Sequence, residues 1–150
     1  MSKLKYLGTY VSPLLALISF NCTGFFAYSG IIFLYVMVPI LENLIPKNNY
    51  NFSKEENKSA KHDWFYDWIL YLLVPIHLYV IYVFLITIAN PALELVDLIG
   101  HVLIMGTILG VNGINGGHEL GHKIDHPFKM LLARILLTTS FQNHFITYHN

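Results

Sequence analysis

The sequence predicts an all-α protein embedded in a membrane, and its composition and the spacing of its charges carry that prediction. Of the 150 residues, 55% are hydrophobic and 12% are charged, whereas roughly 25% of the residues of an average soluble domain are charged. A spanning helix needs about 20 mostly apolar residues. Asp, Glu, Lys and Arg are absent from three long stretches: 6–41, 68–93 and 98–118. The first stretch is long enough for two spans, and each of the others is long enough for one.

The first stretch divides into two expected spans, 6–20 and 31–45, with a polar turn between them. Residues 21–30 contain Asn21, Gly24 and Gly30, which favour a turn. A basic start followed by an apolar run is also typical of a signal peptide. No cleavage pattern of small residues follows it, so we expect the segment to stay as a membrane helix.

Residues 46–63 are rich in Asn, Lys, Glu and Ser and predict a solvated loop. Aromatic residues gather where the next apolar run begins, as they do at the headgroup level of a bilayer. We expect the third span over 68–89. The aromatic group consists of Trp64, Phe65, Tyr66, Trp68 and Tyr71.

The fourth span is predicted to start at Asn90, because asparagine caps helices and the following Pro91 fits a first helical position. Continued to Lys123, it covers about 33 residues and about 50 Å, several turns more than a bilayer needs. The excess carries the histidines near its end to the membrane surface. After Pro127, residues 128–141 predict a partly apolar interfacial helix.

The basic residues predict the orientation of the bundle. With four spans all nine fall on one side, and the two opposite turns, 21–30 and 89–97, contain none. Basic loops face the cytoplasm. We therefore expect a multi-pass protein of the bacterial inner membrane whose N-terminus, middle loop and histidine-rich end are cytoplasmic.

Charge and cysteine content exclude several classes of function. Nine basic residues balance nine acidic ones, so no basic field exists to attract nucleic acid. Cys22 is the only cysteine, which excludes an internal disulfide and a CxxC metal centre. Any redox chemistry must therefore take its electrons from another molecule.

The run NGGHELGHK, residues 115–123, is the most informative motif. His118 and His122 are four residues apart, so a helix presents both imidazoles on one face, where they can hold one metal ion. Among the remaining histidines, we expect His62 and His126 at the surface. His77 and His101 lie within spans, where ionisable groups usually face the protein interior and either pack there or support function.

Beside the family resemblance described below, two further interpretations of this motif stay open on the residues alone. HELGH fits the HExxH pattern of zinc peptidases, in which Glu119 would activate water. That interpretation needs a third ligand, and the only carboxylate after His122 is Asp125, which is too close in sequence. A non-enzymatic scaffold or transporter fragment is the third possibility.

The motifs together resemble one family. GHELGHK at 117–123 and HFITYHN at 144–150 are similar to the integral-membrane alkane 1-monooxygenases of the desaturase-like di-iron superfamily. The resemblance extends over the whole chain. It includes the runs KYL at 5–7, PILE at 39–42 and VPIH at 74–77.

The resemblance implies terminal hydroxylation of n-alkanes to primary alcohols with O2, two iron ions and electrons from rubredoxin, itself reduced by rubredoxin reductase. It implies that His118, His122 and His149 are metal ligands. His144 is close to the second box without matching one of its usual ligands, and is a candidate neighbour of them. On the residues alone, Glu119 either hydrogen-bonds to a ligand histidine or faces water on the far side of the helix. Tyr148 stands where many members have glutamate. An apolar tunnel would select the alkane, and the second span offers candidate walls: Phe33, Leu34, Tyr35 and Met37.

Three histidine ligands are too few for a di-iron site. We therefore expect residues 1–150 to be the N-terminal part of one membrane-embedded catalytic domain that continues into further histidine boxes. On its own this part is expected to be inactive.

Overall fold

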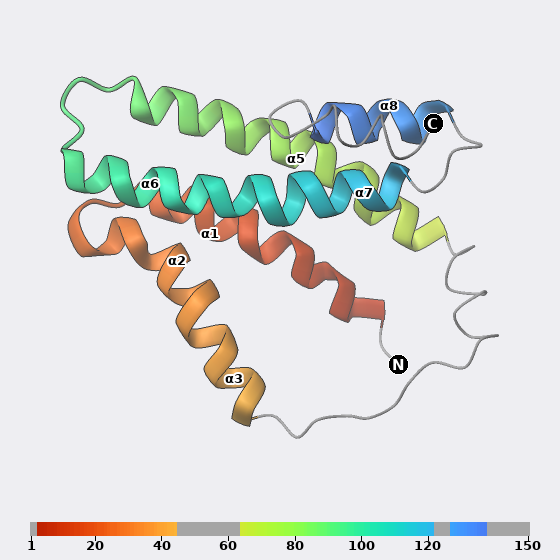
Figure 1. The fold of residues 1–150 in the computed structure, drawn as a ribbon, viewed down its shortest axis with the longest axis horizontal. Coiled ribbons are helices and arrows are strands. Elements are labelled where there is room, and N and C mark those ends of the chain that lie inside the picture. The colour runs from red at the N-terminus through yellow and green to blue at the C-terminus, as the bar shows by residue number, and fades with distance from the viewer. Residues whose placement is uncertain (1–2, 45–63, 122–126, 138–150) are drawn as a thin grey trace.

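In a computed structural model the chain forms a helical bundle, and the structure describes residues 3–44, 64–121 and 127–137 (Figure 1). These residues contain helices and turns and no strand. Two of the helical segments, η3 and η4, are π-helical, and η1 and η2 are 3-10 helices. In chain order the elements are η1 (Lys3–Tyr10), α1 (Val11–Phe20), η2 (Gly24–Tyr28), α2 (Ser29–Ile32), η3 (Phe33–Met37), α3 (Val38–Leu44), α5 (Trp64–Ile88), α6 (Leu95–Ile108), η4 (Leu109–Ile114), α7 (Asn115–Gly121) and α8 (Pro127–Leu136).

Three helical runs are long and apolar enough to cross a membrane: Gly24–Leu44, Asp67–Ile88 and Leu95–Leu120. A shorter apolar helix, Leu7–Phe20, precedes them. This set of helices confirms the expected all-α membrane bundle. The expected loop at 46–63 lies outside the described residues.

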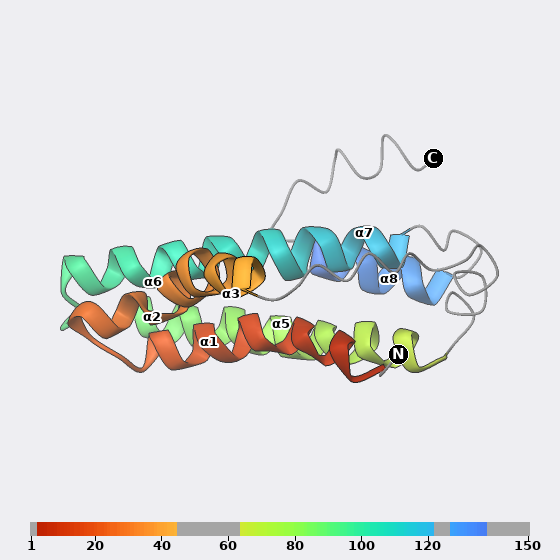
Figure 2. The same cartoon turned by 90° about the horizontal axis from the view of Figure 1, so that it is seen from below.

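The bundle has two layers, with α1 and α5 in one and α6 to α7 and α2 to α3 in the other (Figure 2). One apolar cluster joins α1, α5 and α6 at its centre, and partly buried residues of α2 and η3 pack against it. The segment from η3 to α3 diverges from the other helices (Figure 1). The cluster consists of Ala16, Phe20, Val80, Ile104, Met105 and Ile108.

Hydrogen bonds close the end of the bundle where α1 turns into α2 and α5 turns into α6. The buried Asp97 carboxylate accepts from the Gly24 N–H over 2.6 Å, and Gly24 has a φ of 61°, which glycine adopts readily. The Nε2 of His101 donates to the Ser19 carbonyl over 2.9 Å. We call Ser19, Gly24, Asp97 and His101 the turn-end network.

The predicted start of the fourth span at Asn90 is wrong, since α6 begins at Leu95. The Asn90 side chain instead accepts a hydrogen bond from the Ala92 N–H over 3.0 Å, and the Asn90 carbonyl accepts from Leu93 over 3.1 Å. Asparagine followed by proline therefore makes a turn here, because its side chain bonds two residues ahead without starting a helix.

The third span begins at Asp67, next to the predicted start, and the helix that carries it, α5, already starts at Trp64. The aromatic group thus lies on its first turns and not in front of it. Ring contacts connect these side chains, with centroids 5.5 Å apart for Trp64 and Trp68 and 6.4 Å apart for Trp68 and Tyr71. The Tyr71 ring also contacts Phe128 of α8 at 5.6 Å.

The last described helix, α8, folds back along α7 in both views (Figures 1 and 2). Its Lys129 Nζ donates to the Asp67 carboxylate of α5 over 2.6 Å. An apolar cluster that includes Leu120 and Leu136 joins α5, α7 and α8. The helix exists where the sequence predicted one, and its position at the membrane interface stays a prediction.

Candidate metal site

The helix that carries His118 is one run from Leu95 to Gly121, as expected, but its middle is the π-helical segment η4. A π-turn adds a residue to a helix and is frequent at functional sites. The turn therefore changes which residues of α7 face the bundle.

Two glycines allow α7 to pack tightly inside the bundle. A Cβ on Gly116 would lie 2.9 Å from Leu73 Cδ2 of α5, and one on Gly117 would lie 2.8 Å from Leu137 Cγ, just after α8. Such distances leave no room for a side chain. These glycines thus permit the close helix approach expected from the motif.

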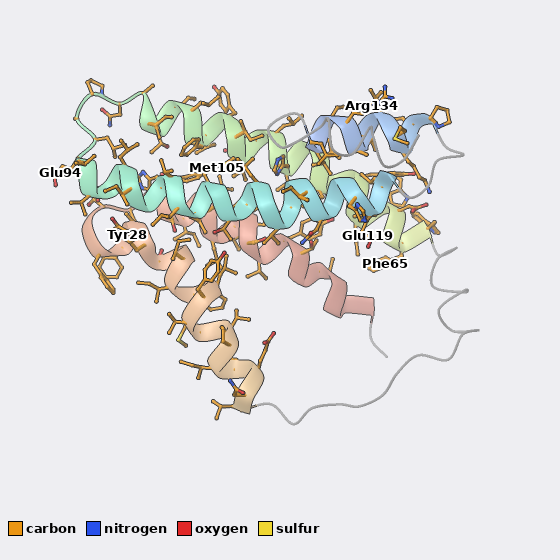
Figure 3. The ribbon with its side chains drawn as sticks, viewed as in Figure 1. Tyr28, Phe65, Glu94, Met105, Glu119 and Arg134 are labelled. Atoms are coloured by element: carbon orange, nitrogen blue, oxygen red, sulfur yellow. The ribbon has the colours of Figure 1, made fainter. Side chains whose placement is uncertain are left out.

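His118 and Glu119 are exposed on α7, whereas the neighbouring Gly116, Gly117 and Leu120 are buried. Figure 3 shows Glu119 on α7, at the end of the bundle where α5 begins near Phe65. The imidazole of His118 is accessible to further ligands from outside the described helices. This position fits a metal ligand whose partners come from other parts of the protein.

The remaining predicted site residues, His122, His144 and His149, lie outside the described residues, as do His62 and His126. Within residues 3–44, 64–121 and 127–137, no three His, Cys, Asp or Glu side chains gather into a metal-binding group. The ligand set therefore stays a prediction beyond the placement of His118.

His77 and His101 are both buried, as expected for histidines within spans, but their surroundings differ. His101 Nε2 donates to the backbone carbonyls of Ser19 and Cys22. Neither ring nitrogen of His77 makes a hydrogen bond to the described part of the chain. Asn112, which the sequence analysis did not single out, lies buried in η4, and its Oδ1 accepts from Ser12 over 3.0 Å.

Comparison with known proteins identifies relatives for nearly the whole chain. It is 25% identical over 141 residues to alkane 1-monooxygenase 1 of Alcanivorax borkumensis, with 93% of this chain and 34% of that protein covered. It is 26% identical over 157 residues to the alkane 1-monooxygenase of Pseudomonas putida, with 100% and 39% covered. For that of Acinetobacter baylyi the identity is 28% over 128 residues, with 83% and 30% covered. This chain is similar to the alkane 1-monooxygenases.

No family model matches the chain. It spans about a third of the length of the alkane 1-monooxygenases that it matches. These relatives confirm the predicted resemblance.

The alkane 1-monooxygenase resemblance also supplied the candidate channel residues, all of which lie in η3. Leu34 packs against the central apolar cluster, and Phe33 is half-buried. Tyr35 and Met37 point to the exposed side of the described bundle. Their role as channel walls stays a prediction.

Proposed function

We propose that the protein of which this sequence is all or part hydroxylates the terminal carbon of n-alkanes with O2, giving primary alcohols. The observation that carries the proposal is the similarity to alkane 1-monooxygenases over 83–100% of the chain. Two features are consistent with it: the apolar spanning helices and the outward position of His118.

Two iron ions are the metal that this proposal requires. His118 would bind iron together with His122 and His149, and Glu119 and His144 would hydrogen-bond to ligands. A metal-ligating histidine usually donates its other ring N–H to a neighbouring group, which fixes the ring. The iron pair would supply the chemistry that activates O2.

The substrate enters this proposal through the membrane. An n-alkane has no polar group, so recognition must come from the shape and length of an apolar tunnel, with about 0.8 kcal/mol gained for each buried CH₂. The diverging η3 segment, with Phe33 and Leu34 towards the bundle and Tyr35 and Met37 exposed, would form part of the wall. Further helices or lipid would cover its outer side.

For the source of the electrons we propose rubredoxin with its reductase. Cys22 is the only cysteine of this chain and lies half-buried at the turn between α1 and η2, away from α7 in the bundle. It offers no second sulfur for an internal redox pair. The distribution of basic residues supports a docking side that faces the cytoplasm.

The direct test is conversion of octane to 1-octanol by membranes that contain the full-length protein, O2, NADH, rubredoxin and its reductase. We expect product that depends on rubredoxin. Membranes without rubredoxin and membranes of host cells without the protein are the controls. No product from any n-alkane, together with stoichiometric zinc, would contradict the proposal and favour the peptidase.

A further inference from the structure

Three polar side chains from three helices converge on one turn of η4, six residues before His118. Ser12 of α1, His77 of α5 and Asn112 of η4 are 6%, 0% and 1% exposed. The Ser12 hydroxyl donates to Asn112 Oδ1 over 3.0 Å. A Cβ on Gly113, next to Asn112, would lie 3.3 Å from Cε1 and 3.5 Å from Nε2 of His77. We call Ser12, His77 and Asn112 the buried polar cluster.

The cluster has hydrogen-bonding atoms that the described part of the chain does not satisfy: Nδ1 and Nε2 of His77 and Nδ2 of Asn112. A buried polar group without a partner destabilises a fold. Inside a membrane, bulk water is not available to compensate. These atoms therefore need partners that the described helices do not supply.

The chemistry of these atoms fits water better than an ion. A neutral imidazole has one donor and one acceptor, and the Asn112 amide nitrogen is a donor only. The amide N–H groups would repel a metal cation, and no cationic side chain is present in the cluster to attract an anion. Water donates and accepts, and buried waters typically make about three hydrogen bonds to such groups.

The π-turn that holds Asn112 decides where His118 points. Before it, the buried positions of α6 include Asp97, His101, Ile104 and Ile108. An α-helix continued from Ile108 at 3.6 residues per turn would bring 112, 115 and 119 to the same face and leave 118 at the edge of that face. After η4 the buried positions are 112, 113, 116, 117 and 120, so 116 and 120 take the inward places of 115 and 119, and 118 is exposed on the outer side.

We propose that the buried polar cluster binds ordered water, and that Asn112 and His77 are positioning residues which, through this water, hold η4 in its π-helical form and His118 on the outer face. The water site stands on the geometry alone. The positioning role rests on the proposed function, because it takes His118 as an iron ligand.

Water-edited solid-state NMR of the ¹⁵N-labelled full-length protein in lipid bilayers tests the water site. We expect magnetisation from water to reach both ring nitrogens of His77 and the Asn112 amide faster than Nε2 of His101. Nε2 of His101 is the matched control because the His101 ring is equally buried and this nitrogen donates to two carbonyls, whereas Nδ1 of His101 has no described partner and is left out of the comparison. Equal or slower transfer to His77 and Asn112 would overturn the water site.

A pair of glycine variants sharpens this measurement. Gly113→Ala places a methyl group against the Nε2 edge of His77, whereas an added Cβ on Gly110 meets nothing within 4 Å. Slower transfer to His77 in Gly113→Ala, with no change in Gly110→Ala, is the expected result. The same transfer rate in both variants would contradict the assigned geometry.

Iron affinity and thermal unfolding of full-length variants test the positioning role. In Asn112→Leu and His77→Leu we expect iron to be held about 10- to 100-fold more weakly, while the unfolding temperature stays about equal, since the polar atoms are removed together with the water that completes them. His77→Gln should recover most of the affinity. Thr107→Val is the matched control, because the Thr107 hydroxyl bonds only to Leu103 O of its own helix over 3.1 Å.

The outcomes separate the two proposals. Wild-type protein without iron would defeat the proposed function, and the NMR comparison would still decide the water site. Wild-type protein with iron that Asn112→Leu and His77→Leu hold equally tightly would defeat the positioning role alone. A fall in unfolding temperature that accounts for the iron loss would assign the cluster a purely structural role and also defeat it.

Discussion

The two polar regions of this bundle differ in how their hydrogen bonds are completed. In the turn-end network, Asp97 accepts from Gly24, and His101 Nε2 donates to the Ser19 carbonyl, leaving only Nδ1 of His101 without a described partner. Around η4 both ring nitrogens of His77 have none. Further along the same helix, His118 is exposed.

This difference indicates that the two regions of the helical run from α6 to α7 have different roles, one structural and one functional. Polar groups that bond to backbone across a turn fix the turn and have little capacity for a ligand. Polar groups that remain unmatched in a membrane bundle are costly, so they are expected where a ligand completes them. We infer that the turn-end network holds the helices together and that the η4 to α7 region binds ligands.

The largest expected effect concerns the side of the membrane that each end faces. In a Cys22→Ser background, Asn90→Cys should react with an impermeant maleimide added to intact spheroplasts, because Asn90 is exposed at the turn end. Ser59→Cys should react only after the membrane is opened. Labelling of Ser59→Cys from outside intact spheroplasts would show that the orientation is the reverse of the predicted one.

The next effect distinguishes the two regions by activity. His118→Ala and His122→Ala in the full-length protein should abolish octane hydroxylation while the protein stays inserted, because ligands are lost and the apolar spans are intact. His62→Ala should be nearly neutral. Equal losses in His62→Ala and His122→Ala would refute the division between ligand and surface histidines.

The turn-end network should affect stability more than activity. Asp97→Ala removes the buried carboxylate that accepts from the Gly24 N–H, and removal of a charged hydrogen-bond partner costs about 1.5–3 kcal/mol. Thermal unfolding in nanodiscs measures this loss. Glu94→Ala is the control, since the exposed Glu94 makes no side-chain cap bond to α6. Equal unfolding temperatures for the two variants would show that the network contributes nothing.

Glu119→Gln should have the smallest effect on chemistry if the motif belongs to a hydroxylase. Glu119 would then act only through a ligand, and its loss should cost at most about 10- to 100-fold in octane hydroxylation. A zinc peptidase would lose nearly all activity with metal still bound, because the glutamate is its general base. The comparison with His149→Ala, which should remove hydroxylation, distinguishes the two enzymes.

The long elements of the fold were predictable because charge is so expensive in a bilayer that its absence marks each span. The start of α6 was not, since the Asn90 side chain serves a turn as readily as a helix cap. The π-turn at η4 was not predictable, because the shift of the inward positions from 115 and 119 to 116 and 120 appears only in the burial pattern of the folded helix.

The site was predictable only where a short motif specifies it. His118 and the packing glycines of α7 follow from local spacing. Asn112 was missed because its partner, Ser12, is 100 residues away in the sequence. His77 and His101 looked alike in sequence, and only the packing of α5 and α6 against α1 and η4 separates them.

Metal analysis of the purified full-length protein tests the central claim most directly, that the face of α7 with His118 holds part of an iron centre. We predict two iron ions per chain in the wild type and a marked loss of iron in His118→Ala, with His101→Ala retaining iron to the extent that it folds. Stoichiometric zinc without iron, or iron unchanged in His118→Ala, would contradict the account.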